Sequence, residues 1–280
     1  MRFAIDVPNF GAYADPRTLA ALAREAEDAG WDGFFIWDHI QVGWPDPVAD
    51  PWVALAAIAA ATSRVRIGPL VTPLFRRNPW KLARESVSLD YLSSGRLVLG
   101  VGLGDNVFTE ITTFNGSLDN RVRAAMLDEG LAVLTGLWSG APFSFTGTHY
   151  VVHETTFLPA PIQRPRIPIW VAGMWPNKPP FRRAARYDGV VPISTDIEHS
   201  LSPDEVRALI IYMRAHRKSD APFEVVCSGE TPAADACCAR DIIAPYADAG
   251  ATWWLESVLP WKTSFSDFRA RIVAGPPQLA

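Results

Sequence analysis

Short runs of uninterrupted apolar residues alternate with longer amphipathic runs along the whole chain. The apolar runs predict eight strands, at 2–7, 33–39, 65–72, 96–104, 168–173, 189–194, 223–229 and 252–257. Each is followed by a predicted helix, at 16–30, 51–62, 79–93, 119–138, 180–188, 202–218, 234–250 and 265–274. The strands are apolar throughout rather than at alternate positions, which is typical of parallel strands with both faces covered.

The helix boundaries carry their own signals. Asp15 before Pro16 predicts the start of the first helix, and Asp50 predicts the start of the second. The first and seventh helices end at Gly30 and Gly250, and a strand follows each almost at once. We interpret these two turns as structural connections at the amino-terminal face of a parallel sheet.

Eight strand–helix units in 280 residues predict an α/β fold, a (β/α)8 TIM barrel that forms a single domain over 1–280. No stretch has the composition of a domain linker. The segment 140–167 interrupts the rhythm and predicts a hairpin and a proline-rich loop, inserted after the fourth helix. A doubly wound open sheet is the alternative.

Composition narrows the function classes. The net charge is −4, and no basic run suggests nucleic-acid binding. The most apolar window, 52–61, is too short to cross a bilayer, and the first ten residues do not resemble a signal peptide. We therefore expect a cytoplasmic protein with a small-molecule substrate and no membrane or nucleic-acid partner.

Cysteines are few, which suits a reducing compartment. They stand at Cys227, Cys237 and Cys238, and we interpret the last two as packing residues within a helix. No Cys-x-x-Cys or His-x-x-x-His pattern occurs, so no metal site is expected.

In a TIM barrel the active site lies at the carboxyl ends of the strands. His39 is the strongest candidate there, because histidine side chains exchange protons near neutral pH. Each other candidate also has a purely structural reading; Asp38, for example, can cap a loop, and Glu256 can simply pair with an arginine. The full set is Asn9, Asp38, His39, Thr72, the segment 102–105, the segment 173–178, Ser194, Glu230 and Glu256.

The glycines of the fourth strand, in GVGLGD at 100–105, do not form a dinucleotide fingerprint. That motif opens a helix in an early βαβ unit, whereas these glycines lie within and just after a strand. We expect them to let a flat ring approach the backbone, and tight barrel packing is the alternative.

Two loops compete as phosphate sites. The segment 171–183 joins a strand to a helix start and carries Lys178, Arg182 and Arg183. The segment 227–236 follows the seventh strand, where barrels often bind phosphate.

Several of the 11 tryptophans fall near strand ends, at positions 37, 44, 175, 253 and 254. Some are expected to line an apolar slot for a planar ligand. Trp253 and Trp254 face opposite sides of their strand, so at most one points into the barrel.

Four stretches together resemble the bacterial luciferase-like monooxygenase superfamily: GWDGFFIWDHI at 30–40, the block from IGPLVTP to GVGLGD at 67–105, PIWVAGMWPN at 168–177 and RRAARYDGVVP at 182–192. Members are TIM barrels that use FMN or the deazaflavin coenzyme F420. The Asp-His pair at 38–39 is the form typical of the F420 branch, so the resemblance favours coenzyme F420, with FMN as the alternative.

The resemblance also implies roles. His39 would lie beside the ring and move the proton coupled to hydride transfer, and a non-prolyl cis peptide is expected at 69–70 or 70–71. The predicted catalytic residues are His39, Asp38 and Asp105. The predicted cofactor-binding residues are Asn9, Leu70, Val71, Thr72, Gly102, Gly104, Gly173, Met174, Trp175, Asn177, Lys178 and Arg182.

The leading hypothesis is thus an F420-dependent oxidoreductase that transfers hydride to or from a small organic substrate. An FMN-dependent monooxygenase, a flavin-binding barrel without turnover and a metal-dependent hydrolase are the alternatives. A homo-oligomer is possible through the alanine-rich helix at 53–61.

Overall fold

The computed structural model describes residues 1–114, 116–196, 199–257 and 259–278. Its main sheet contains nine parallel strands in the order β3-β2-β1-β11-β10-β9-β8-β5-β4. They are β1 (Arg2–Val7), β2 (Gly33–Ile36), β3 (Arg66–Pro69), β4 (Thr72–Pro73), β5 (Leu99–Gly102), β8 (Ile169–Trp175), β9 (Gly189–Ser194), β10 (Glu224–Gly229) and β11 (Trp253–Ser257).

The sheet closes on itself between β3 and the segment that enters β5. Ile67 N donates to Arg96 O at 3.1 Å, and Val98 N donates to Ile67 O at 2.9 Å. β3 and β4 follow each other in the chain and together occupy one strand position beside β5. The nine strands therefore fill eight positions around the barrel. The predicted TIM barrel is confirmed, and the open sheet was the wrong alternative.

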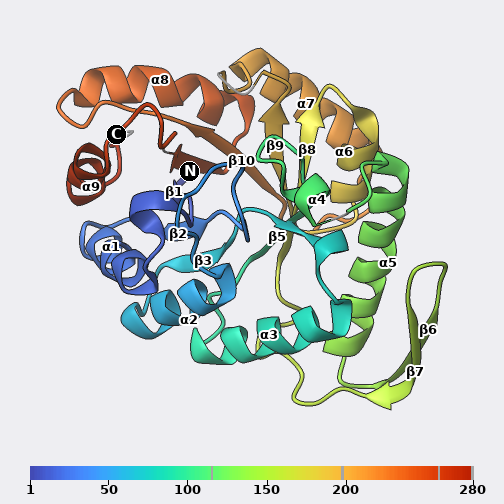
Figure 1. Cartoon of the computed structure of the whole chain (residues 1–280). Coiled ribbons are helices and arrows are strands. Elements are labelled where there is room, and N and C mark those ends of the chain that lie inside the picture. Colours follow the sequence, from blue (N-terminus) through green and yellow to red (C-terminus); the bar gives the residue numbers. More distant parts are fainter. Residues whose placement is uncertain (115, 197–198, 258, 279–280) are drawn as a thin grey trace.

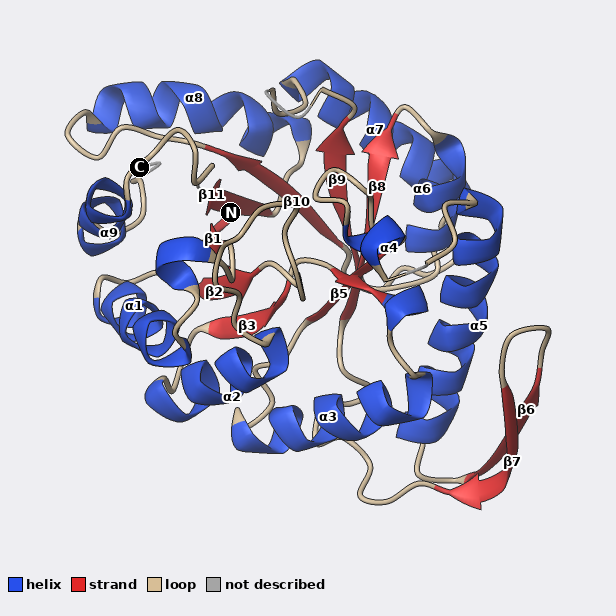
Figure 2. Ribbon diagram, in the orientation of Figure 1, coloured by secondary structure: helices blue, strands red, loops and turns tan. Residues whose placement is uncertain are grey.

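Helices surround the strands as an outer ring (Figure 2). The long ones follow the prediction to within a few residues: α1 (Pro16–Asp28), α2 (Pro51–Ala61), α3 (Pro79–Leu92), α5 (Asn120–Trp138), α6 (Lys178–Ala184), α7 (Pro203–His216), α8 (Ala236–Ala249) and α9 (Phe265–Val273). Asp15 and Asp50 cap α1 and α2 as expected, by accepting from backbone N–H groups of the first turn. Gly30 and Gly250 follow α1 and α8 with φ of 95° and 103°, a conformation that favours glycine.

Three short helices were not predicted. They are η1 (Gly11–Tyr13), η2 (Leu74–Arg76) and α4 (Glu110–Thr113). Each follows the carboxyl end of a strand, where the sequence has no periodic pattern long enough to reveal one turn.

The hairpin formed by β6 (Pro142–Thr146) and β7 (Val151–Thr156) lies between α5 and β8 and projects away from the barrel (Figure 1). It occupies the insertion predicted at 140–167. Tyr150, at its turn, packs edge-on against Trp80 of α3.

The barrel interior is filled by alternate residues of the strands. Ala4, Phe35, Trp170, Val226, Trp253 and Leu255 belong to this inner cluster, whereas Trp254 packs in the layer between strands and helices. The expectation that only one of Trp253 and Trp254 enters the barrel is therefore confirmed.

The predicted strand at 65–72 is interrupted. A cis peptide joins Leu70 to Val71, the second of the two expected positions, and separates β3 from β4. The backbone from Pro69 to Val71, which contains this cis peptide, forms a bulge that Gly100 and Gly102 of β5 face. A Cβ on Gly100 would lie 2.3 Å from Pro69 O, and one on Gly102 would lie 2.8 Å from Val71 Cγ2. These glycines give the bulge its space, which is the packing role proposed as the alternative.

One packing prediction was wrong. Cys237 and Cys238 lie in α8 but are exposed, because the buried face of that helix is formed by Ala239, Ile243 and Ala249. No helix in the described ranges is long and apolar enough to cross a membrane. Among those residues there is also no group of three or more His, Cys, Asp or Glu side chains that could hold a metal ion.

Candidate active site

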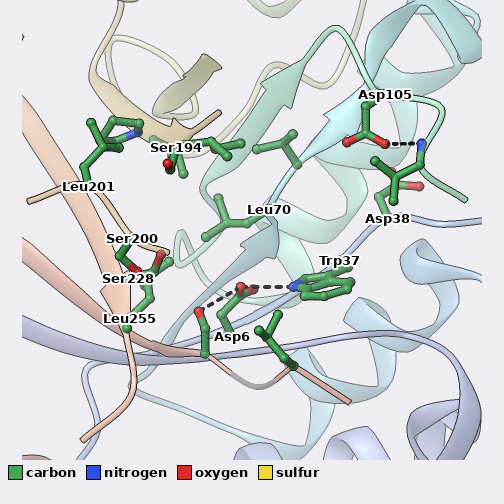
Figure 3. A pocket seen from close by; sticks show the side chains of 18 of the residues that line it. Asp6, Trp37, Asp38, Leu70, Asp105, Ser194, Ser200, Leu201, Ser228 and Leu255 are labelled. Carbon is green, nitrogen blue, oxygen red and sulfur yellow. Dashed lines mark hydrogen bonds between the residues drawn. The ribbon is translucent and has the colours of Figure 1, made fainter. Parts of the chain in front are cut away.

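A cavity of about 540 Å³ opens at the carboxyl ends of the barrel strands. Its lining comes from loops and strand ends far apart in the sequence, including Trp37 after β2, Leu70 and Val71 in the bulge, Ser194 of β9 and Ser228 of β10 (Figure 3). This is the position at which TIM barrels place their active sites.

The three residues predicted to be catalytic, Asp38, His39 and Asp105, all line the cavity. The ring of His39 is partly buried and lies edge-on to Phe108, with ring centroids 4.8 Å apart. Asp105 is exposed, and its Oδ1 accepts from Val107 N at 2.9 Å in a turn contact.

Asn9 positions His39 through the backbone. Asn9 Nδ2 donates to His39 O and to Ala49 O, each at 2.7 Å, and His39 N donates to Asn9 Oδ1 at 3.2 Å. Asn9 is fully buried and does not line the cavity. We therefore assign it a positioning role rather than the cofactor contact expected from the sequence.

Asp38 lines the cavity, but its side chain is bound by neighbouring residues. Its side chain is buried and accepts hydrogen bonds from Thr72 Oγ1 at 2.7 Å and from Arg77 Nη2 at 2.8 and 3.0 Å, as well as from Arg76. A carboxylate held by two guanidinium groups has no free lone pair for proton transfer. Thr72 in turn is fully buried beneath Asp38.

Glu110 is the acid that the sequence did not single out. Arg76 bridges Glu110 and Asp38, and Glu110 Oε1 accepts from Ile40 N and Gln41 N, just after His39. Burial disfavours the charge on Glu110, but the neighbouring His39 and Arg76 outweigh it and lower the pKa of the carboxyl. The available sequence signal was an acid between the end of β5 and the next long helix.

Asp6 is the second functional candidate that the sequence missed. It lines the cavity, and burial raises its pKa to about 7, although hydrogen bonds from Trp37 and Ser257 act in the opposite direction. The available signal was an acid near the carboxyl end of an otherwise apolar strand.

The two competing phosphate loops lie differently. The strand-β10 end contributes Cys227, Ser228, Gly229 and Glu230 to the lining, whereas no residue of 173–182 belongs to it. Lys178 Nζ instead lies over the rings of Trp175 and Tyr212, 3.5 and 4.6 Å from their centroids. Of the other predicted cofactor residues, Leu70, Val71 and Gly104 line the cavity; Gly102, Gly173, Met174, Trp175, Asn177 and Arg182 do not.

Ser194 lines the cavity as well, but Glu256 does not. Glu256 faces the outer layer, where Arg271 Nη2 lies 3.3 Å away and Thr231 donates from both its N–H and its hydroxyl. Its structural reading, pairing with an arginine, is the one the structure supports.

Comparison with known proteins agrees with this architecture. The family model for luciferase-like monooxygenases matches residues 1–248. An F420-dependent glucose-6-phosphate dehydrogenase of Beutenbergia cavernae is 35% identical over 167 residues, which is 58% of this chain and 48% of the relative. The chain thus spans about half the length of the curated relatives it matches.

Two solved structures superpose over nearly the whole chain. One is an F420-dependent secondary alcohol dehydrogenase in complex with an F420–acetone adduct, with a TM-score of 0.78, 18% identity and coverage of 97% of this chain and 98% of that chain. The other is a monooxygenase from Streptomyces bottropensis, with a TM-score of 0.75, 22% identity and coverage of 98% of both chains. These structures share the fold of the chain. The match of the family model over most of the sequence shows that the chain belongs to the luciferase-like monooxygenase family.

Proposed function

We propose that this protein is a coenzyme F420-dependent oxidoreductase that transfers hydride between the deazaflavin and a small organic substrate. The observation that carries the proposal is the similarity to a glucose-6-phosphate dehydrogenase, at 35% identity over 167 residues. The name of that relative states that it depends on F420. The cavity at the barrel mouth, with His39 in its lining, supplies the corresponding chemistry.

The cavity suits a flat heterocycle. Leu70 and Val71, on either side of the cis peptide, form an apolar wall together with Pro73 and Phe75. When bound, the deazaflavin supplies a carbon that accepts or gives up hydride. The residues that would hold the deazaflavin are Leu70, Val71 and Gly104, and the loop after β10 also lines the cavity.

His39 is then the residue that handles the coupled proton. Asn9 fixes its backbone, Phe108 limits the movement of its ring, and Glu110 places a negative charge beside Nδ1. A histidine oriented in this way is suited to general acid–base catalysis. This arrangement favours an enzyme over a flavin-binding barrel without turnover.

Titration of the purified protein with F420 and, separately, with FMN tests the proposal. We expect tighter binding of F420. Tighter binding of FMN would favour the FMN-dependent monooxygenase reading, and binding of neither would contradict both. We further infer a cytoplasmic, single-domain enzyme, and a homo-oligomer remains a prediction that solution mass measurement can test.

A further inference from the structure

Asp6 has a buried carboxyl group, and one of its two oxygens lacks a hydrogen-bond partner among the described residues. It alternates with Ala4 along β1 and therefore points into the barrel, one layer above the inner apolar cluster. Oδ2 accepts from Trp37 Nε1 at 3.0 Å and from Ser257 Oγ at 3.3 Å. Oδ1 is buried and has no hydrogen-bond partner within the described part of the chain.

The surroundings of Asp6 form a polar side of the cavity. Ser257 pairs in register with Asp6, and Ser228 of β10 alternates with Val226 and so faces the same interior. Figure 3 shows Asp6 between Trp37 and the strand ends that carry Ser228 and Leu255, with Leu70 across the space. The opposite wall is the apolar bulge, so the cavity has two chemically distinct sides.

An unsatisfied buried carboxyl oxygen costs free energy unless a ligand completes its hydrogen bonds. The raised pKa of Asp6 reflects this cost, since burial is its largest cause. Both the charged and the neutral forms of the carboxyl are therefore accessible near pH 7. The charged form accepts a hydrogen bond from a hydroxyl group, and the neutral form donates one to a carbonyl group.

We propose that Asp6, held in place by Trp37 and Ser257, binds the uncharged hydroxyl group of an alcohol substrate through Oδ1 and so determines the substrate class of the enzyme. This inference rests on the proposed function, because alcohol and carbonyl are the two forms that hydride transfer would interconvert. An anionic group is the wrong ligand at Asp6, because the charged carboxylate repels it and the hydrogen-bond partners of Asp6, an indole and a hydroxyl, carry no compensating positive charge.

The test follows the indole N–H of Trp37 by nuclear magnetic resonance, because that group donates directly to Asp6. The protein is titrated with 2-propanol, acetone and glucose 6-phosphate at pH 8, with and without F420, and the signal is assigned with Trp37→Phe. We expect 2-propanol to shift the signal saturably, and glucose 6-phosphate to leave it unchanged.

Asp6→Asn sharpens the test. The amide keeps an acceptor for Trp37 and Ser257 but replaces the free oxygen with a donor. We expect 2-propanol to bind roughly tenfold more weakly to this variant, because a hydrogen bond to a charged acceptor is replaced by one from a neutral amide, while acetone binds at least as tightly as before. Asp241→Asn, an exposed carboxyl on α8, serves as the matched control and is expected to change neither affinity.

Three results would overturn the proposal: no saturable effect of 2-propanol on Trp37, equal affinity in Asp6→Asn, or tighter binding of glucose 6-phosphate than of 2-propanol. Failure of F420 to bind would instead count against the proposed function. In that case, a saturable effect of 2-propanol on the Trp37 signal without F420 would still support the Asp6 site.

Discussion

The carboxylate of Glu110 lies 3.7 Å from Nδ1 of His39, and it also accepts a hydrogen bond from Arg76. The distance from Nδ1 is that of an ion pair rather than a hydrogen bond. Because the pKa of Glu110 is lowered, this negative charge is present at neutral pH. His39 therefore lines the cavity with a fixed anion beside its ring, an arrangement that suits a proton-transferring residue.

The first prediction concerns His39→Ala. We expect kcat to fall by about 10²- to 10⁴-fold, the usual contribution of a general acid–base residue, while the dissociation constant for F420 changes little. Steady-state kinetics and cofactor titration measure the two quantities. His153→Ala, on the exposed strand β7, is the control and is expected to leave both unchanged. Equal losses in kcat and cofactor affinity would contradict a chemical role for His39.

The second prediction concerns the bridge between Asp38 and Glu110. Arg76→Met removes a guanidinium that contacts both acids and leaves two buried carboxylates short of a partner. Breaking a buried pair from one side typically costs about 3–5 kcal/mol, so we expect a loss of that order in the free energy of unfolding measured with urea.

The control for Arg76→Met is Arg17→Met. Arg17 forms an ion pair with Asp15, but its side chain is 91% exposed, and solvent screening leaves such a pair with little effect on stability. If the two variants lose similar stability, the buried network does not have the structural role assigned to it here.

Much of the fold could be predicted because each strand and helix is locally consistent. The apolar runs and the caps at Asp15 and Asp50 indicate where elements start, and eight repeats leave few alternatives to a barrel. The ends of strands were less well predicted: the run at 33–39 continues past the end of β2 at Ile36, because Trp37 to His39 already belong to the cavity wall.

The site was predicted in outline only. Local sequence marks strand ends and so found His39, but it cannot show which distant side chains meet there. Arg76 reaches Asp38 and Glu110 across 38 and 34 positions of the chain. Asp6 was missed because a single acid in a strand has no pattern; its burial and its free oxygen exist only once the barrel has closed.

The third prediction tests the glycines beside the bulge. In Gly100→Ala the new methyl carbon would lie 2.3 Å from the backbone oxygen of Pro69, which cannot move without shifting β3. In Gly102→Ala the nearest atom is Val71 Cγ2, at 2.8 Å, and a side chain can rotate away. Overpacking a core typically costs about 1–3 kcal/mol. We expect Gly100→Ala to lower the free energy of unfolding by more than this, and Gly102→Ala to lower it by less than Gly100→Ala does.

Urea denaturation of the two glycine variants measures the difference, and each serves as the comparison for the other. A larger loss in Gly102→Ala would show that side-chain crowding, rather than backbone contact, limits substitution in β5.

The last prediction is the pH dependence of stability caused by Asp6. Its pKa is about 7 in the folded protein, compared with 3.8 for an unperturbed aspartate, so the folded state binds more protons between these values. The stabilising effect of that proton is full below pH 4 and is lost as the pH rises through 7. The shift corresponds to about 4 kcal/mol at most.

Asp6→Asn cannot ionise, so its stability should lack this contribution. The difference in unfolding free energy between the variant and the natural protein, measured with urea from pH 4 to pH 8.5, should therefore move in favour of the variant as the pH rises. Asp241→Asn should run parallel to the natural protein throughout, and the same parallel behaviour in Asp6→Asn would mean that Asp6 keeps an ordinary pKa and is not an enclosed acid.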